Sequence, residues 1–170
     1  MKRNMKVLKR QFNSQKCIVC GMNNDLGLKA KFYELDSGEL CAVFTPAEEH
    51  QSYPGRMHGG ISAAILDETI GRAITVGKEE MVWGVTIDLK LRYKKPVPLN
   101  EELVAVGRIT NGKSRKVFEG TGELILPNGE IAVEAYGRYM KVPLDEIAGD
   151  EFARQEWLVN VDDTTTEIEI

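Results

Sequence analysis

Residues 57–72 carry the side chains of this chain that are best suited to acyl-transfer chemistry. They read Met-His-Gly-Gly-Ile-Ser-Ala-Ala-Ile-Leu-Asp-Glu-Thr-Ile-Gly-Arg. Gly59 and Gly60 would leave bare backbone amides at a helix N-terminus, where the helix dipole favours negative charge. Asp67 follows about two to three turns further along the helix. A donor pair for a developing oxyanion and a semi-buried carboxylate together indicate a hydrolase that acts on an acyl carbonyl.

Two neighbouring acids on this helix have different surroundings. Glu68 has Arg72 four residues later, a spacing that makes a favourable surface ion pair. The helical contact positions of Asp67 hold only small or apolar residues, namely Ala63, Ala64, Ile70 and Gly71. An unpaired carboxylate on an apolar stripe is costly. Asp67 rather than Glu68 is therefore the candidate catalytic acid.

The elements that must position these residues are one helix and several strands. The helix is expected from about Gly60 to Val76, ending near Gly77, and is apolar or small nearly all round, which predicts burial. Alternation and turn signals predict strands at 28–35, 39–44, 83–93, 102–110, 115–126 and 130–142. This pattern predicts an α+β fold in which a five- to six-stranded antiparallel sheet wraps one long buried helix. The uncovered sheet face and edges indicate a symmetric dimer or higher oligomer.

The strand after the helix alternates regularly between apolar and polar residues. One face is predicted to carry Trp83, Val85, Ile87, Leu89, Leu91 and Tyr93. Thr86 falls on the opposite face, away from the apolar residues.

The chain reads as one domain with an appendage at each end. Residues 17–142 form the predicted domain, residues 1–16 a basic N-terminal appendage, and residues 143–170 a C-terminal extension with an acidic tail, helical around 152–157. The charged ends are interpreted as solvated segments.

Composition excludes several classes of function. The chain has 170 residues and a formal net charge of −4, which argues against nucleic-acid binding. No segment approaches the roughly 18 apolar residues of a membrane span, and no signal peptide precedes the domain. These absences, with three cysteines, indicate a cytoplasmic protein that does not bind membranes.

Cys17 and Cys20 form a C-x-x-C motif that lacks a second half. A zinc site would need further soft ligands with metal-like spacing, and only Cys41, His50 and His58 remain. The motif is therefore interpreted as a structural turn before the first strand. The sequence predicts neither a metal nor a cofactor.

Several of these residues together resemble the hot-dog-fold acyl-CoA thioesterases, in particular the phenylacetate-pathway type. The resemblance spans about residues 17–142. It rests on His58-Gly59-Gly60, the acid nine residues after the histidine, the strand Gly84-Val85-Thr86-Ile87-Asp88-Leu89, and Pro96-Val97-Pro98. The Cys-x-x-Cys-Gly motif and the following Asn24-Asp25-Leu26-Gly27-Leu28 are similar to an N-terminal pattern of some members.

The resemblance implies a role for each matching residue. Asp67 matches the catalytic acid, as nucleophile or as general base on water, and Thr86 matches a hydroxyl residue that holds this water. Gly59 matches the residue whose amide polarises the thioester carbonyl, with Gly60 beside it, and His58 matches the histidine that orients this region. Members with an Asn or Gln six residues before the histidine gain a further hydrogen bond to the carbonyl. Here that position is Ser52, with Gln51 beside it.

The resemblance also implies a partner and a substrate. In the family the histidine-glycine half and the acid-hydroxyl half of the site come from different subunits, so a homodimer or dimer of dimers is expected, with the active site at the seam. Coenzyme A phosphates need positive charge, and Arg115 and Lys116 are candidates for contacting them.

Two alternatives remain open. Hot-dog dehydratases use a loop histidine before Pro-Gly and a helix glutamate, for which His50 and Glu68 are the matching residues. A non-catalytic acyl-CoA-binding module is the other alternative, since fold does not determine function.

Overall fold

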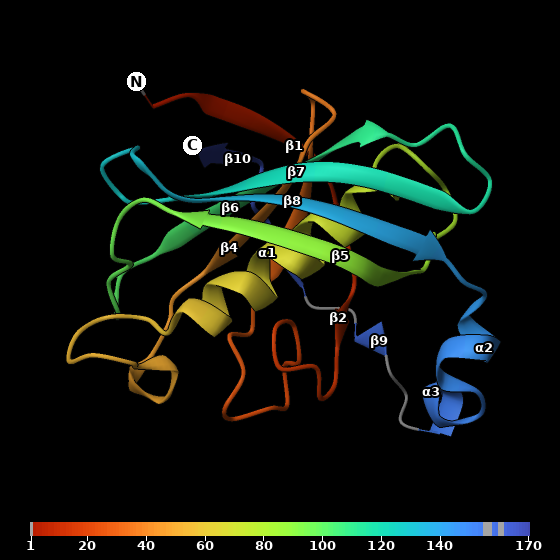
Figure 1. Ribbon diagram of the computed structural model, residues 1–170, viewed down its shortest axis with the longest axis horizontal. Coiled ribbons are helices and arrows are strands. Elements are labelled where there is room, and N and C mark those ends of the chain that lie inside the picture. Colours follow the sequence, from red (N-terminus) through yellow and green to blue (C-terminus); the bar gives the residue numbers. More distant parts are fainter. Residues whose placement is uncertain (1, 155–157, 160–161) are drawn as a thin grey trace.

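An antiparallel sheet curls around one long helix, as the sequence predicted (Figure 1). The structure is a computed structural model that describes residues 2–154, 158–159 and 162–170. In the sheet, eight strands lie in the order β10-β1-β3-β4-β6-β7-β8-β5, and β2 and β9 form a separate pair. The helix α1 spans Gly59–Ala73 and lies across the concave face.

The six predicted strands are present with small changes at their ends. They are β3 (Lys31–Leu35), β4 (Leu40–Phe44), β5 (Gly84–Tyr93), β6 (Leu103–Asn111), β7 (Val117–Ile125) and β8 (Ile131–Lys141). Short elements complete the chain: β2 (Asn13–Ser14), the 3-10 helix η1 (Glu48–His50), α2 (Leu144–Ala148), α3 (Glu151–Arg154) and β9 (Leu158–Val159). Of the helix expected at 152–157, residues 152–154 lie within α3 and residues 155–157 lie outside the described residues.

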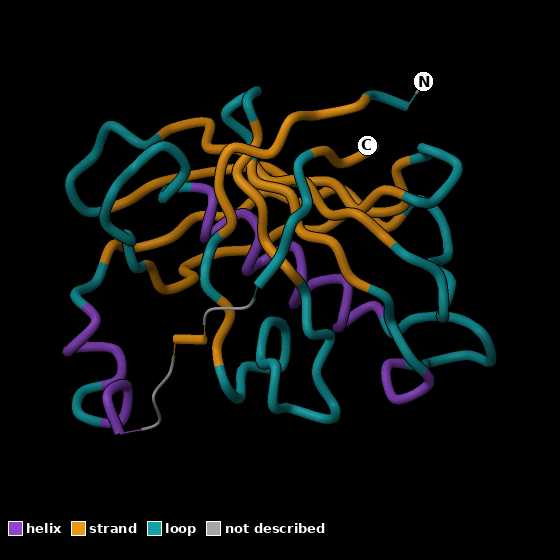
Figure 2. Tube along the Cα trace, turned by 180° about the vertical axis from the view of Figure 1, so that it is seen from behind, coloured by secondary structure: helices purple, strands orange, loops and turns teal. Residues whose placement is uncertain are grey.

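The N- and C-terminal segments join the sheet, contrary to the expectation of solvated appendages. β1 (Asn4–Arg10) pairs with β3 and with β10 (Glu167–Glu169), so the two ends of the chain lie side by side (Figure 2). Lys2 and Glu169 form an ion pair of 3.3 Å, and Asn4 Nδ2 donates to Glu167 at 2.6 Å. The basic and acidic ends that looked like two separate features of the sequence are therefore complementary. The sheet has two more strands than the upper limit predicted.

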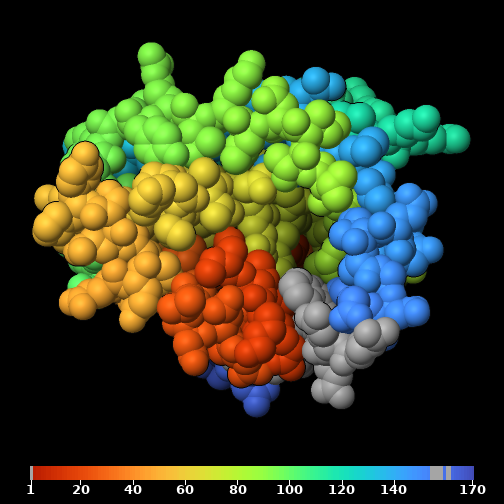
Figure 3. Space-filling model, turned by 60° about the horizontal axis from the view of Figure 1, so that its bottom comes forward, coloured from red at the N-terminus to blue at the C-terminus, as the bar shows by residue number. Residues whose placement is uncertain are grey.

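Helix α1 buries one stripe rather than its whole circumference. The buried residues follow helical spacing: Ser62, Ile65, Leu66, Thr69, Ile70 and Ala73. Asp67 and Glu68, on the flanks, are only half-buried. The prediction of burial on every side is wrong because the sheet covers one face of the helix, and the N-terminal loop covers the opposite side only in part (Figure 3).

The helix lies unusually close to the strands beneath it. A Cβ at Gly107 of β6 would lie 2.8 Å from the Thr69 carbonyl oxygen, and a Cβ at Gly120 of β7 would lie 2.7 Å from the Ile70 side chain. Real Cβ atoms do not approach so closely, so these strands carry glycine where the helix crosses them. The position of α1 over the sheet is fixed by this contact.

A β-bulge in β5 changes the predicted direction of Thr86. The register of β5 against β8 shifts between Thr86 and Asp88, so Ile87 is the extra residue and is 49% exposed. The strict alternation is therefore wrong: Thr86 points to the helix side together with Leu89, Leu91 and Tyr93, whereas Val85 pairs with the exposed Met140. β5 is an edge strand and pairs only with β8 in the described part of the chain.

Two apolar clusters fill the two sides of the sheet. The larger lies between α1 and the concave face and includes Phe32, Phe118 and Tyr139. The smaller, around Tyr33 and Ile168, lies on the other face where β1 and β10 cover it. Among the described residues, no helix is long and apolar enough to span a bilayer.

Gly107→Ala is expected to lower the free energy of unfolding by about 1–3 kcal/mol, as overpacking of a filled core does. The added methyl meets helix backbone, which cannot rotate away. Urea unfolding checks this, with Lys90→Ala at an exposed position of β5 as the control expected to stay within about 0.5 kcal/mol. Equal stability of Gly107→Ala and the wild-type chain would contradict the close packing.

Candidate functional site

His58 caps the N-terminus of α1. Its backbone is extended, with φ −63° and ψ 137°, and its Nδ1 accepts a hydrogen bond of 2.8 Å from the Gly60 N–H. An imidazole nitrogen that accepts an N–H carries no proton itself, so the proton of the neutral ring lies on Nε2. His58 thus fixes the first turn of the helix, and the exposed ring offers Nε2–H as a donor.

Only one of the two predicted amide donors is available. The Gly60 N–H is occupied by His58, whereas no hydrogen bond among the described residues uses the Gly59 N–H. Of the two predicted amide donors, only the Gly59 N–H therefore remains available. The first amides of a helix have no partner within the helix, which leaves Gly59 free to bind an oxyanion.

Tyr93 lies against this helix start, a contact that the sequence did not reveal. Its hydroxyl donates to the Gly59 carbonyl oxygen at 2.7 Å, and a Cβ at Gly59 would lie 3.3 Å from the ring. The alternation placed Tyr93 on an apolar face, where a hydroxyl gives no signal of its role. Glycine at position 59 lets the ring pack closely against the helix start.

Asp67 and Thr86 form the acid-hydroxyl half of the site. The Thr86 hydroxyl lies 2.9 Å from Asp67 Oδ1 and 3.1 Å from Oδ2, so it donates to the carboxylate and is shared by both oxygens. The helix supplies the acid from its flank, and the bulged edge strand supplies the hydroxyl. The family resemblance implied this pair, although the alternation of the strand placed Thr86 on the face that the bulge reverses.

Burial raises the pKa of the Asp67 carboxyl above its ordinary value, because a half-buried carboxylate loses hydration. The hydrogen bond from Thr86 stabilises the ionised form and opposes this rise. The nearby negative charge of Glu68 adds a smaller upward effect. A carboxylate that is more basic than usual and still reaches the surface is suited to accept a proton from water.

Tyr139 supports Asp67 from below. It is 2% exposed, and its hydroxyl donates to the backbone carbonyl of Asp67 at 3.0 Å. Its ring stacks on Phe118 with the centroids 5.0 Å apart. The sequence offered no spacing that could link Tyr139 to a residue 72 positions earlier.

The two halves of the predicted site lie apart within one chain. Gly59 and Asp67 are eight residues apart on a continuous helix, which is about 12 Å along its axis. A carbonyl oxygen bound at the Gly59 amide is therefore beyond the reach of a water held by Asp67 of the same helix.

Ser52 and Gln51 are engaged in their own loop. The Ser52 Oγ accepts from the Tyr53 N–H at 2.6 Å, and the Gln51 Oε1 accepts from the Gly55 N–H at 3.0 Å. Backbone pairing of Gln51 with Met57 closes this loop beside the helix start. Each oxygen thus stabilises a tight turn.

Arg115 and Lys116 are exposed in the turn between β6 and β7. The Lys116 carbonyl accepts from the Lys141 N–H at 2.7 Å, and Lys141 pairs with Gly84 at the start of β5. The turn therefore lies at the same end of the sheet as Thr86.

The residues of the dehydratase alternative are occupied elsewhere. His50 is 5% exposed: its Nδ1 accepts from the Ala47 N–H at 2.9 Å, so Nε2 donates to the Leu26 carbonyl at 2.9 Å. Glu68 pairs with Arg72 at 2.9 Å as predicted, but the pair lies under the N-terminal loop, where its side chains are only 19% and 15% exposed. This is a covered pair rather than the expected surface pair, and neither residue is free to act on a substrate.

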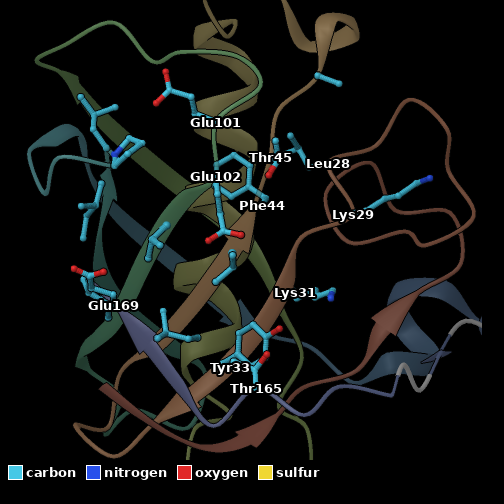
Figure 4. A pocket seen from close by; sticks show the side chains of 18 of the residues that line it. Leu28, Lys29, Lys31, Tyr33, Phe44, Thr45, Glu101, Glu102, Thr165 and Glu169 are labelled. Atoms are coloured by element: carbon cyan, nitrogen blue, oxygen red, sulfur yellow. The ribbon is translucent and has the colours of Figure 1, made fainter. Parts of the chain in front are cut away.

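A cavity of about 970 Å³ lies away from Asp67. Much of its lining comes from the sheet face opposite the helix, including Tyr33, Val43 and Val104 (Figure 4). Charged residues such as Lys31 and Glu102 border it. Of the predicted site residues, only His50 lines this cavity.

Comparison with known proteins supports the predicted family. The Thioesterase superfamily model matches residues 54–123. Acyl-coenzyme A thioesterase THEM4 of Mus musculus is 29% identical over 114 residues, covering 66% of this chain and 47% of that protein. Acyl-coenzyme A thioesterase 13 of Homo sapiens is 26% identical over 95 residues, covering 52% of this chain and 67% of that protein. The chain thus spans less than half of the length of mouse THEM4.

Solved structures share the fold. A thioesterase superfamily protein superposes with a TM-score of 0.66 and 28% identity, covering 74% of this chain and 60% of that one. The PaaI protein from the phenylacetic acid degradation operon of E. coli gives 0.60 at 13% identity, covering 68% and 81%. The chain is therefore related to the thioesterase superfamily and has its hot-dog fold, as its motifs predicted.

Asp67→Asn is expected to stabilise the fold at neutral pH. Because the folded-state pKa of Asp67 is raised, the folded state holds a proton that the unfolded chain has already released, and stability falls as the pH rises through this window. Asn removes the buried charge and still accepts from Thr86. Urea unfolding at several pH values should show a gain at pH 7 that fades below the ordinary aspartate pKa of about 4.

Asp88→Asn is the control, because it removes a negative charge from β5 on the face opposite Thr86. A gain for Asp67→Asn that is constant with pH, or matched by Asp88→Asn, would contradict the burial effect.

Proposed function

We propose that this chain hydrolyses an acyl-CoA, or a similar acyl thioester, to the free acid and the thiol. The observation that carries the proposal is the Asp67 carboxylate held by the Thr86 hydroxyl on a half-buried flank of α1. Relatives named acyl-coenzyme A thioesterases and the shared fold support it.

The substrate carbonyl binds at the helix start. Its oxygen accepts from the Gly59 N–H, and the positive end of the helix dipole stabilises the negative charge that develops on it. His58 keeps this turn in place through its bond with the Gly60 N–H. Ser52 and Gln51 shape the loop that borders the bound carbonyl.

Asp67 supplies the second part of the reaction. As a general base it takes a proton from a water that Thr86 helps to hold, and the resulting hydroxide attacks the carbonyl carbon. Direct attack by the carboxylate, through an acyl-enzyme anhydride, uses the same position. In both routes the thioester carbon–sulfur bond breaks and the thiol leaves with a proton.

The complete site needs two chains. One chain separates Gly59 from Asp67 by about 12 Å, so the carbonyl at one helix start must face the acid of another molecule. A twofold axis beside the open edge of β5 reverses the partner's helix and brings its Asp67 towards Gly59. We therefore infer a homodimer, or a dimer of such dimers, with the active site at the seam.

Arg115 and Lys116 are proposed to bind the phosphates of coenzyme A. They are exposed, positively charged, and at the same end of the sheet as Thr86. A cytoplasmic location is proposed from the three free thiols, which a reducing compartment preserves.

Asp67→Asn is expected to lower kcat for acyl-CoA hydrolysis by about 10²–10⁴-fold, the usual contribution of a general base, with little change in KM. The thiol released from a panel of aryl-, short- and long-chain acyl-CoAs is measured with a thiol-reactive dye. Asp88→Asn, on the other face of β5, is the matched control and should keep wild-type rates.

Undiminished hydrolysis by Asp67→Asn would overturn the assignment of the acid. Tight acyl-CoA binding by the wild type without thiol release would instead identify a non-catalytic binding module, and hydration of an enoyl-CoA without thiol release would restore the dehydratase alternative.

Gly59→Pro is expected to lower kcat by about 10²–10³-fold, as loss of one oxyanion donor does. Proline removes the N–H and suits the first position of a helix. It also requires an extended conformation of the preceding residue, which His58 already has. Gly59→Ala keeps the N–H and is the matched control.

Mixing the two inactive variants tests the seam. When Gly59→Pro and Asp67→Asn chains are unfolded together and refolded, half of the dimers are mixed, and each mixed dimer has one site with both groups intact. Activity should recover to about a quarter of the wild-type value. No recovery, with mixed dimers verified by mass spectrometry, would place both groups of each site in one chain.

A further inference from the structure

A tight turn brings Cys17 and Cys20 together against the middle of α1. The Gly21 N–H donates to the Cys17 carbonyl at 2.8 Å and closes the turn. The two Sγ atoms and a Glu68 carboxylate oxygen all lie within 4.8 Å of one another. A Cβ at Gly21 would lie 2.4 Å from the Cys17 carbonyl oxygen, so the turn requires glycine there.

Each sulfur atom has a partner suited to a different step of thiol chemistry. The Cys17 Sγ donates to Glu68 Oε2 at 3.2 Å, so its proton already points at a base. The Cys20 Sγ accepts from Arg72 Nη2 at 3.1 Å, a contact that stabilises negative charge on that sulfur. The Val19 N–H also donates to Cys17 Sγ at 3.3 Å.

The two thiols differ in access. Cys17 is half-buried and can be reached from solvent, whereas Cys20 is only 1% exposed. The hydrogen bond with Cys20 holds the pKa of Cys17 below its usual value. The same bond, together with burial, raises the pKa of Cys20. This asymmetry is that of an attacking and a resolving cysteine.

The same cluster has the side chains of a partial metal site, but the positively charged side chain of Arg72 already contacts two of them. The Arg72 guanidinium contacts both Cys20 Sγ and Glu68 Oε1, at 3.1 and 2.9 Å. It is also held by the Phe12 carbonyl at 2.8 Å and stacks 4.4 Å from the centroid of the Phe32 ring. A divalent ion beside this fixed positive charge would be repelled, so the arrangement favours a dithiol.

We propose that Cys17 and Cys20 form a redox-active dithiol that low-molecular-weight disulfides oxidise to an intramolecular disulfide, with Cys17 attacking and Cys20 resolving. The site is separate from Asp67 and Gly59 and does not depend on thioester hydrolysis. The proposal gives a chemical role to the C-x-x-C motif, for which the sequence indicated only a structural turn.

The reaction balances with glutathione disulfide as the oxidant. Cys17 passes its proton to Glu68 and its sulfur attacks one sulfur of glutathione disulfide, whose S–S bond breaks to release one glutathione thiolate. Cys20 then loses its proton and attacks the Cys17 sulfur, which releases the second glutathione. The protein loses two electrons, glutathione disulfide gains them, and the two thiol protons end on the two glutathione molecules.

The experiment titrates the full chain with mixtures of reduced and oxidised glutathione, quenches in acid, alkylates the remaining thiols and counts them by mass spectrometry. The wild type should lose two of its three thiols in one step, and Cys41 should remain. Cys20→Ser should stop with one glutathione on Cys17, and Cys17→Ser should form no intramolecular disulfide. Cys41→Ala is the matched control and should behave as the wild type.

Circular dichroism of each variant verifies that it is folded, and Cys20→Ala replaces Cys20→Ser if the buried hydroxyl prevents folding. The proposal is overturned if the wild-type chain keeps three thiols at every glutathione ratio, or if its mixed disulfide persists as in Cys20→Ser. It is also overturned if the purified chain holds one zinc ion and its thiols react only after chelation.

Discussion

The close approach of α1 to the sheet is the constraint on which the other features depend. At Gly107 the helix backbone and the strand leave no room for a methyl group. Because the helix lies this deep, its flank rather than its outer surface reaches the edge strand, and Asp67 comes to lie opposite Thr86. A helix further from the sheet would leave the same carboxylate fully hydrated and no more basic than an ordinary one.

The deep position of α1 also destabilises the ionised Asp67 carboxylate. A half-buried carboxylate loses hydration, and the Thr86 hydroxyl, which donates to both of its oxygens, offsets part of that loss. Tyr139 also compensates, because its hydroxyl holds the Asp67 backbone carbonyl and favours the ionised form of the carboxyl. Such a compromise between stability and a poised acid is common where chemistry takes place. It is a reason to propose Asp67, an acid without a basic neighbour on its own helix, as the catalytic acid.

Much of the fold followed from local pattern. Helical spacing located α1, and turn residues such as Asn111-Gly112 separated β6 from β7. The pairing of Asp67 with Thr86 came from a family resemblance, and the bulge at Ile87 that makes it possible leaves no mark on an alternating sequence. The occupation of the Gly60 amide by His58 likewise depends on a side-chain rotamer, which sequence spacing does not specify.

Pairing between segments far apart in the sequence was the main feature that the sequence did not predict. β1 and β10 come from opposite ends of the chain, and their charges hid the alternation of Met5 and Val7. The sequence failed to predict that Glu68 is covered for the same reason, since the loop that covers it lies about fifty residues earlier. Both errors concern residues whose partners are distant in sequence.

Arg72 has a wider consequence. One guanidinium joins the Phe12 carbonyl, the Cys20 sulfur and the Glu68 carboxylate while its face covers Phe32. If any one of these partners is removed, the remaining partners must balance a positive charge that is nearly enclosed. The effects of substitutions in this group on the free energy of unfolding will therefore not add. The N-terminal loop and the centre of α1 therefore form one energetic unit, in which a change on one side is transmitted to the other.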